Sequence, residues 1–178
     1  MKPRVDRLVA EKSVLRGMKR SDIPRWSKWF NDNQILQHSV HRFRGYTEEQ
    51  QTMVYEKLLN DPTKVQFMIC EPKQLIGIGV ISFTVSSHLY ESADISIIIG
   101  EKQYWGKGIA TEAIEEIIGY CVKHHKITRF TAGWDVRNVG SQKAFEKNGF
   151  VVFEKIPKLI KYLDEEKLHD TIRSEKLI

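Results

Sequence analysis

The segment Asp94–Glu112 reads DISIIIGEKQYWGKGIATE. Its first part, up to Ile99, is apolar and rich in β-branched residues, which is typical of a buried strand. Two glycines stand two positions apart within residues 103–108. From Ile109 onward, apolar residues recur at the spacing that places side chains on one face of a helix. The segment therefore predicts a strand, a glycine-rich turn and the start of a helix.

The turn between this strand and helix has the features of an anion site. Gly106 and Gly108 permit positive φ angles and a close approach of the backbone to a ligand. The first amides of the following helix have no partner within the helix and lie at the positive end of its dipole. Lys107 adds a positive charge. We therefore expect a phosphate or diphosphate group at residues 105–111.

The spacing of the glycines argues against two common phosphate-binding motifs. The chain has no GxxxxGK[ST] P-loop, and a dinucleotide-binding GxGxxG turn would need a third glycine after Gly108. The pattern present is Q-x-x-G-x-G, beginning at Gln103, and it is followed at residues 138–150 by NVGSQKAFEKNGF. In this order the two motifs resemble the cofactor-binding motifs of the GNAT N-acetyltransferase superfamily. Over residues 13–173 the chain most resembles its RimJ/RimL-like, ribosomal-protein acetyltransferase subgroup.

The rest of the chain predicts a single mixed α/β domain spanning 1–178. Residues 1–12 are polar and basic without an apolar period, and we expect a flexible lead-in there. Ser21 and Asp22 are expected to cap a helix with Pro24 in its first turn, and a capping box at residues 47–50 opens a second helix. The other expected elements are strands at 14–18, 65–70, 75–85 and 127–134, a helix at 138–148, a strand at 150–156 ended by Pro157, and a hairpin of 159–163 and 168–172 around Asp164-Glu165-Glu166. In this order the helices cover both faces of one sheet, and the resemblance implies that the sheet is mostly antiparallel.

Composition limits the class of protein. The chain has 178 residues, 41% hydrophobic and 29% charged, as in ordinary globular domains. Its net charge of +5 suits a phosphate-rich cofactor. No apolar run approaches the roughly 20 residues of a membrane span. Cys70 and Cys121 are isolated and suggest neither a metal site nor a disulfide framework. We expect a cytoplasmic protein with no metal and no membrane or nucleic-acid partner; a homodimer is compatible with the sequence.

The resemblance implies acetyl-CoA as cosubstrate and a set of residues that contact it. The pantetheine arm would pair with the backbone of the strand before the turn, and the diphosphate would bind the turn. The contact residues expected on this basis are Ile97, Ile98, Ile99, Gln103, Gly106, Lys107, Gly108, Ile109, Ala110, Thr111, Asn138, Ser141, Lys143, Phe145 and Lys147. Asn138 can serve as a helix N-cap as well as, or instead of, a cofactor contact.

The resemblance also suggests catalytic residues. Asp94 is the candidate general base, acting directly or through water; its alternative role is purely structural. Many family members have a tyrosine as acid where this chain has Phe145, so Ser141 or a water would protonate the leaving thiolate. No cysteine lies where an acyl-enzyme would need one, which favours direct attack in a ternary complex.

The acceptor amine is the least determined part of the reaction. We expect its binding residues within 26–46, within 86–92 and on the last hairpin. The candidates are Phe30, Asp32, His38, Arg42 and His88. Arg42 and Arg44 favour a phosphate-bearing acceptor such as a nucleotide-linked amino sugar, while a peptide N-terminus and a polyamine stay open. Two other hypotheses are a non-catalytic acyl-CoA-binding or sensor module and nucleic-acid binding through basic residues 1–20.

Overall fold

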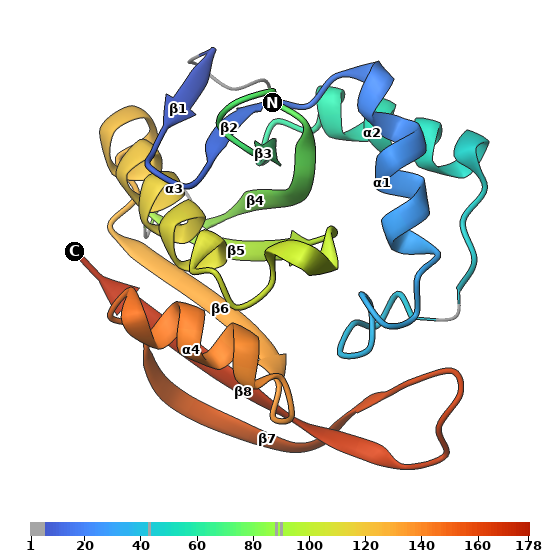
Figure 1. Ribbon diagram of the computed structural model, residues 1–178. Helices are drawn as coiled ribbons and strands as arrows, with labels where there is room; N and C mark the ends of the chain where they lie inside the picture. The colour runs from blue at the N-terminus through green and yellow to red at the C-terminus, as the bar shows by residue number, and fades with distance from the viewer. Residues whose placement is uncertain (1–5, 43, 88, 90) are drawn as a thin grey trace.

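The computed structural model describes residues 6–42, 44–87, 89 and 91–178. One eight-stranded sheet has the strand order β1-β2-β3-β4-β5-β6-β8-β7 (Figure 1). The strands are β1 Arg7–Val9, β2 Val14–Gly17, β3 Lys64–Cys70, β4 Gly77–Ser87, β5 Ser92–Ile99, β6 Arg129–Asp135, β7 Val151–Lys161 and β8 Leu168–Leu177. Neighbouring strands are antiparallel except β5 and β6, which are parallel. This confirms the predicted mixed α/β class and its mostly antiparallel sheet.

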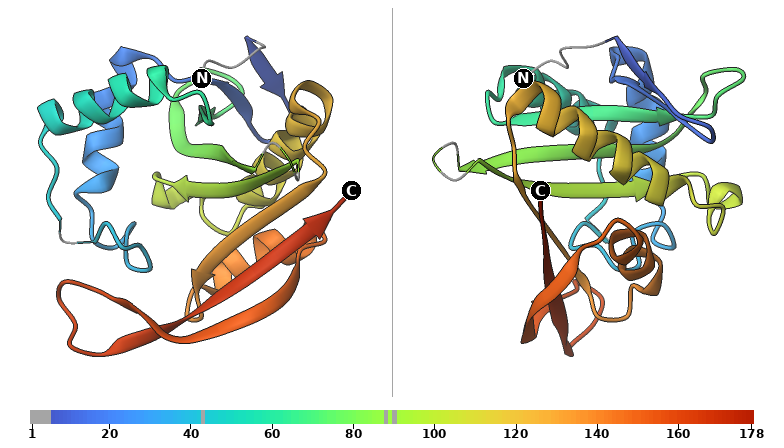
Figure 2. Two further views of the ribbon diagram at one scale, coloured as in Figure 1. Left: turned by 180° about the vertical axis from the view of Figure 1, so that it is seen from behind. Right: turned by 90° about the vertical axis from the view of Figure 1, so that its left-hand side faces the viewer.

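Helices cover both faces of the sheet. They are α1 Ile23–Phe30, α2 Glu48–Asn60, α3 Ile109–His125 and α4 Val139–Lys147, with short 3-10 turns at Arg20–Asp22 and Lys102–Tyr104. The pair α1 and α2 lies on one face, and the pair α3 and α4 lies on the other (Figures 1 and 2). We call these faces the α1/α2 face and the α3/α4 face.

Strand β5 separates two hydrophobic clusters because its side chains alternate between the faces. Ile95, Ile97 and Ile99 belong to the large cluster that includes α3 and α4. Ile98 packs instead with the cluster that contains Trp26 and Trp29 of α1. Both tryptophans are almost fully buried, so the aromatic side of α1 is core.

The predicted N-terminal caps of α1 and α2 are confirmed in part. Thr47 and Gln50 form the predicted capping box of α2. Pro24 lies at the start of α1 as expected, but the expected side-chain cap of α1 is wrong. The Asp22 carboxylate instead accepts hydrogen bonds from the Arg16 guanidinium at 2.7 and 2.8 Å and from the Lys19 amide at 2.8 Å. It therefore connects β2 to the start of α1.

Two further expectations are corrected at the edges of the sheet. The expected lead-in contains β1, which pairs with β2 from Arg7↔Arg16 to Val9↔Val14. Pro157 does not end a strand, because β7 continues to Lys161 with an irregular pairing to β8 between Ile156 and Ile160. Proline is tolerated there because β7 is an edge strand. The predicted last hairpin is present as β7–β8.

A glycine after β5 lets α1 pack onto the sheet. A Cβ atom at Gly100 would lie 2.1 Å from Cδ2 of Trp29. The Trp29 indole N–H also donates to the Glu101 carboxylate at 3.1 Å, and Arg25 pairs with the same carboxylate at 2.9 Å. These contacts fix α1 against the end of β5.

Replacing this glycine should destabilise the fold. Gly100→Ala forces Trp29 or the backbone to move, and we expect a loss of about 1–3 kcal/mol in the free energy of unfolding. The matched control is Gly119→Ala in α3, where no atom lies within 4 Å of the added Cβ. The control should gain about 0.5–1 kcal/mol because alanine favours a helix. Denaturant unfolding measures both changes, and equal stabilities of the two variants would contradict this packing.

Candidate active site between β5 and β6

The two parallel strands at the centre of the sheet part soon after they meet. Their register contains only three pairs among the described residues, ending with Asp94↔Thr131. Beyond that point β5 stays paired with β4 up to Ile99, and β6 stays paired with β8 up to Asp135. Figure 1 shows the two strands diverging. The edge of β5 after Asp94 is therefore left without β6 as its partner.

The predicted glycine-rich turn follows the end of β5. Gly106 and Gly108 have φ angles of 72° and 81°, and α3 begins at Ile109. A Cβ at Gly106 would have no atom within 4 Å, so the glycine serves the backbone conformation and leaves open space. The Trp105 indole N–H donates to the Ile99 carbonyl at 2.8 Å. That carbonyl is thus already paired within the protein.

Lys12, from the connection between β1 and β2, lies beside this turn, and the sequence analysis missed it. The Glu112 carboxylate, in the first turn of α3, accepts from the Lys12 amide at 3.0 Å and from the Ser13 hydroxyl at 2.9 Å. The Lys12 ammonium consequently lies 3.6 Å from where a Cβ of Gly108 would be. It lies in the segment expected to be a lead-in, so no local signal marked it.

The second motif forms the start of α4 as predicted. The Asn138 side chain accepts from the Ser141 amide at 3.0 Å, which confirms its role as N-cap. Ser141 is half-buried in the first turn, whereas Lys143 and Lys147 are exposed. Phe145 is buried and stacks on Trp134 with the ring centroids 5.5 Å apart. Its packing explains the phenylalanine as a core residue.

Asp94 lies where the two strands part. Its carboxylate accepts a hydrogen bond from the Thr131 hydroxyl at 2.9 Å. Burial raises the pKa of Asp94, while the Thr131 hydrogen bond and the positive charge of Arg173 oppose the shift. A carboxylate with a raised pKa is better suited to accept a proton than an ordinary surface aspartate.

Two of the candidate acceptor residues have internal partners. Asp32 pairs with the Lys102 ammonium at 2.7 Å, and this contact lowers the pKa of Asp32. Arg42 pairs with both Asp164 and Glu165. Phe30 is half-buried against Trp26, and His88 lies outside the described residues. The charges of Asp32 and Arg42 thus serve to hold residues 31–46 in place, and direct contact with an acceptor is not needed to explain them.

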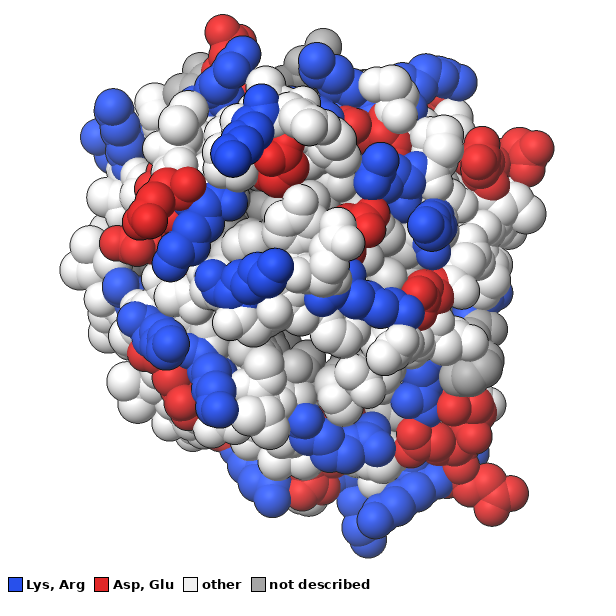
Figure 3. Space-filling model, viewed as in Figure 1, with Lys and Arg blue, Asp and Glu red and all other residues white. Residues whose placement is uncertain are grey.

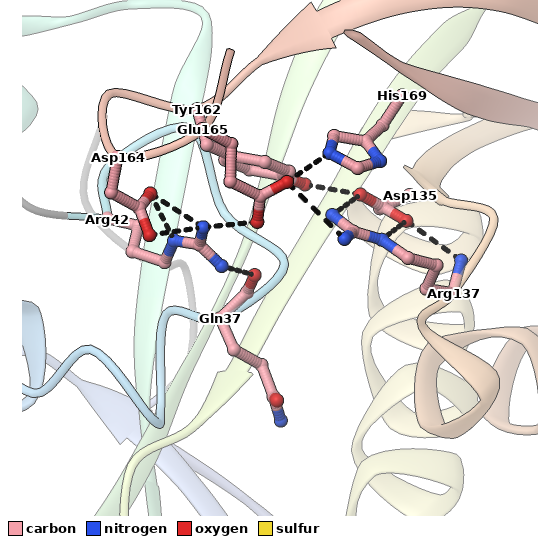
Figure 4. Close-up of polar contacts among 8 residues, drawn as sticks. All are labelled: Gln37, Arg42, Asp135, Arg137, Tyr162, Asp164, Glu165 and His169. Atoms are coloured by element: carbon pink, nitrogen blue, oxygen red, sulfur yellow. Dashed lines mark hydrogen bonds and ion pairs between the residues drawn. The ribbon is translucent and has the colours of Figure 1, made fainter. Parts of the chain in front are cut away.

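Arg42 belongs to a polar group that connects residues 31–46 to the β7–β8 hairpin (Figure 4). We call it the loop–hairpin cluster; its members are Gln37, Arg42, Asp135, Arg137, Tyr162, Asp164, Glu165 and His169. The Arg42 guanidinium contacts Asp164 at 2.6 Å and Glu165 at 2.5 Å, and donates to the Gln37 carbonyl at 2.8 Å. It also lies 4.6 Å from the centre of the Tyr162 ring.

The other half of the cluster is centred on Asp135 at the end of β6. The Tyr162 hydroxyl donates to Asp135 at 2.7 Å, Arg137 pairs with it at 2.8 Å, and Glu165 contacts His169. Burial would raise the pKa of Asp135, but the Arg137 and Tyr162 contacts outweigh it and lower that pKa. The sequence analysis missed the cluster, because Arg42 and Asp164 are 122 positions apart.

His38 lies beside this cluster. Burial is the largest influence on His38 and lowers its pKa, and the charges of Asp135, Arg137, Arg42 and Glu165 also act on it. Its Nδ1 atom is buried without a hydrogen-bond partner. Among the candidate acceptor residues that the structure describes, His38 is therefore the one with a buried polar atom that lacks a hydrogen bond.

Two further features are relevant to the described part of the chain: a membrane-spanning helix and a metal-binding group. Among these residues no helix has the length and apolar character needed to cross a membrane. Nor do they bring together three or more His, Cys, Asp or Glu side chains as a metal ion would require.

Comparison with known proteins agrees with this geometry. A sequence model of the acetyltransferase (GNAT) domain matches residues 12–151. The N-acetyltransferase 9-like protein of Caenorhabditis briggsae is 27% identical over 150 residues, which are 79% of this chain and 75% of that protein.

Solved structures of acetyltransferases have the same fold. RimL, a ribosomal L7/L12 α-N-protein acetyltransferase solved with coenzyme A, has a TM-score of 0.84 at 18% identity, covering 96% of this chain and 97% of that chain. Spermidine N-acetyltransferase of Vibrio cholerae, solved with CoA and spermine, has a TM-score of 0.83 at 20% identity, covering 93% and 95%. Since the family model spans most of the sequence, the chain belongs to the acetyltransferase (GNAT) domain family.

Proposed function

We propose that the protein is an acetyl-CoA-dependent N-acetyltransferase that acts on a primary amine of a small molecule or a protein N-terminus. The observation that carries this proposal is the parting of β5 and β6 beside a turn with two positive-φ glycines. The parted strand edge suits an extended arm, and the turn suits its diphosphate. Family membership supports acyl transfer as the chemistry.

The cofactor would lie along β5 and end at the turn. The Gly100 amide donates to Ile78 of β4, and backbone groups alternate in direction along a strand, so Ile98 also faces β4 while Ile97 and Ile99 face the open edge. The backbone of Ile97 and the Ile99 amide would therefore pair with the pantetheine arm, since the Ile99 carbonyl already accepts from Trp105. The diphosphate would bind the amides of residues 106–110, with Gln103 and Thr111 nearby and Lys107 and Lys12 as counter-charges. Lys143 and Lys147 on α4 would reach the 3′-phosphate. Lys and Arg side chains are spread over the face that carries α3 and α4 (Figure 3), in keeping with a phosphate-rich ligand.

The protein's own residues supply the proton transfers. Acetyl-CoA, when bound, provides an electrophilic thioester carbonyl and a thiol leaving group. Asp94 would accept the proton of the attacking amine, directly or through water, and Ser141 would donate a hydrogen bond near the thioester sulfur. Burial raises the pKa of both Cys70 and Cys121 and leaves them fully inaccessible, which favours direct attack over an acyl-cysteine.

The direct test is thiol release from acetyl-CoA across a panel of acceptors. The panel holds peptide N-termini, polyamines, aminoglycosides, amino acids and nucleotide-linked amino sugars, and calorimetry measures acetyl-CoA binding separately. We expect binding and turnover with one acceptor class. Binding without turnover on any of them would favour a sensor module, and an absence of binding would refute the proposed cofactor site.

The glycine-rich turn provides a specific prediction. Gly106→Val forces a β-branched residue into a positive φ angle and fills the open space at the turn, so the affinity for acetyl-CoA should fall at least about tenfold. Gly45→Val is the matched control, because Gly45 also has a positive φ angle with no atom within 4 Å. We expect both variants to lose a similar amount of stability, and only Gly106→Val to lose affinity for acetyl-CoA. Equal affinities, measured by calorimetry, would contradict the site.

Lys12 should contribute to the affinity through the diphosphate. Lys12→Met should weaken CoA binding several-fold and reduce its salt dependence, because one phosphate counter-charge is lost. The loss should be equal for CoA and dephospho-CoA, which differ only in the 3′-phosphate. Lys73→Met, at the exposed β3–β4 turn, is the control. A loss confined to CoA would instead assign Lys12 to the 3′-phosphate.

Asp94 should determine the acidic limb of the pH–rate profile. Because the reactive form is the carboxylate and its pKa is raised, activity should fall with decreasing pH at a higher pH than an ordinary aspartate would give. Asp94→Asn should reduce kcat/KM about 10²–10⁴-fold and remove that limb. Thr131→Val removes a hydrogen bond that lowers this pKa, so the limb should move to higher pH. An unchanged profile in both variants would exclude Asp94 as the base.

A further inference from the structure

The α1/α2 face carries buried polar atoms that lack hydrogen-bond partners. Three of these atoms are Nδ1 of His38, Oγ1 of Thr171 and Nε of Arg173. Thr171 is only 6% exposed. A buried polar atom without a hydrogen bond is rare in a folded protein and calls for a ligand or another explanation.

Strand register places two of these side chains on the same face as Asp94. Thr131 is the β6 neighbour of Asp94, and its side chain bonds to the Asp94 carboxylate. Gly133 is two residues further along β6, so it lies on the same face. Its partner on β8 is Arg173, and Thr171 is again two residues along. Arg173 and Thr171 therefore follow Asp94 along the diverging arm of the sheet.

Gly133 provides the space that Arg173 occupies. A Cβ at Gly133 would lie 3.4 Å from Cδ and 3.9 Å from Nε of Arg173, so the arginine side chain lies across the glycine. Its charge is close enough to act on the Asp94 carboxylate. Glu154, the β7 register partner of Arg173, is exposed, and no ion pair joins the two in the described part of the chain.

The donor chemistry of Arg173 indicates what it would bind. A guanidinium can only donate hydrogen bonds and is always charged, so its partner must be an oxygen acceptor, best an anion. Four carboxylates near this face are already paired: Asp32 with Lys102, Asp135 with Arg137, and Asp164 and Glu165 with Arg42. The arrangement attracts an anion and does not favour a polycation.

We propose that Arg173 and Thr171 form an acceptor subsite for an oxygen anion, a carboxylate or a phosphate, carried by the acceptor near its amine. This inference rests on the proposed function, since it assigns a charge class to the acceptor of that reaction. With the anion on Arg173, the amine of a small acceptor is directed toward Asp94, where the strands part. Arg173 is then a specificity-determining residue.

The test compares matched acceptors that differ only in the anion. Suitable pairs are an amino acid and its amide, phosphoethanolamine and ethanolamine, and peptides with a free N-terminus that carry aspartate or asparagine at the second position. Wild type should prefer the anionic member of at least one pair, mainly through KM. Arg173→Met should reduce that preference by about tenfold or more, and Arg173→Lys should restore part of it. Lys73→Met, which removes an exposed charge from the β3–β4 turn, should leave it unchanged.

The outcomes separate this proposal from the proposed function. Equal preference in wild type and Arg173→Met, or a preference for spermidine that Arg173→Met does not increase, would overturn the subsite. If no acceptor turns over, calorimetry measures the binding of the same acceptors in the presence of CoA. Tighter binding of the anionic acceptor that is lost in Arg173→Met supports the subsite. Equal binding of the anionic and neutral acceptors to the wild type refutes it. Acetyl-CoA affinity and thermal unfolding of each variant show whether the cofactor site and fold are intact. The preferred pair also distinguishes a carboxylate from a phosphate.

Discussion

The parting of β5 and β6 after Asp94 is the constraint on which the rest of the structure depends. Strand β5 is paired with β4 on its other edge, and β6 is paired with β8 on its other edge. The two halves of the sheet therefore twist apart from the three residue pairs that join β5 to β6. Backbone groups on an unpaired strand edge can pair with an extended ligand. The two diverging strands also position the other parts of the site. The glycine-rich turn follows β5, the start of α4 follows β6, and Asp94 lies where the two strands part.

The two faces of the parted sheet have different chemistry. The α3/α4 face combines helix N-termini with scattered basic side chains, as a phosphate-rich cofactor requires (Figure 3). The segment that follows α1 borders the α1/α2 face. Lys102 contacts this segment at Asp32, and the loop–hairpin cluster contacts it through Arg42 (Figure 4). Arg42 is largely buried, and charge-assisted, bidentate pairs of this kind fix geometry more effectively than single surface ion pairs. The Asp94 side chain lies on the α1/α2 face, at the point where β5 and β6 part.

Local sequence signals predicted the fold well, and long-range pairing explains what they missed. The capping box of α2, the turn at Gly106–Gly108 and the N-cap Asn138 all depend on neighbours within four residues, and all are present. The roles of Arg42 and Asp32 could not be predicted, because their partners Asp164 and Lys102 are distant in sequence. Lys12 and Arg173 carry no motif, and only strand register and the Glu112 contact bring them to the site. Phe145 shows the converse: a motif position that the fold uses for its core.

Amide hydrogen exchange with and without acetyl-CoA tests the central claim most directly, because it reports on backbone groups and needs no acceptor. The proposed site predicts that acetyl-CoA slows exchange at the Ile97 and Ile99 amides of the strand edge and at residues 106–111 of the turn, and leaves α2 unchanged. Protection confined to other parts of the chain, or no protection at saturating acetyl-CoA, would contradict the assignment of the cofactor to the parted edge of β5.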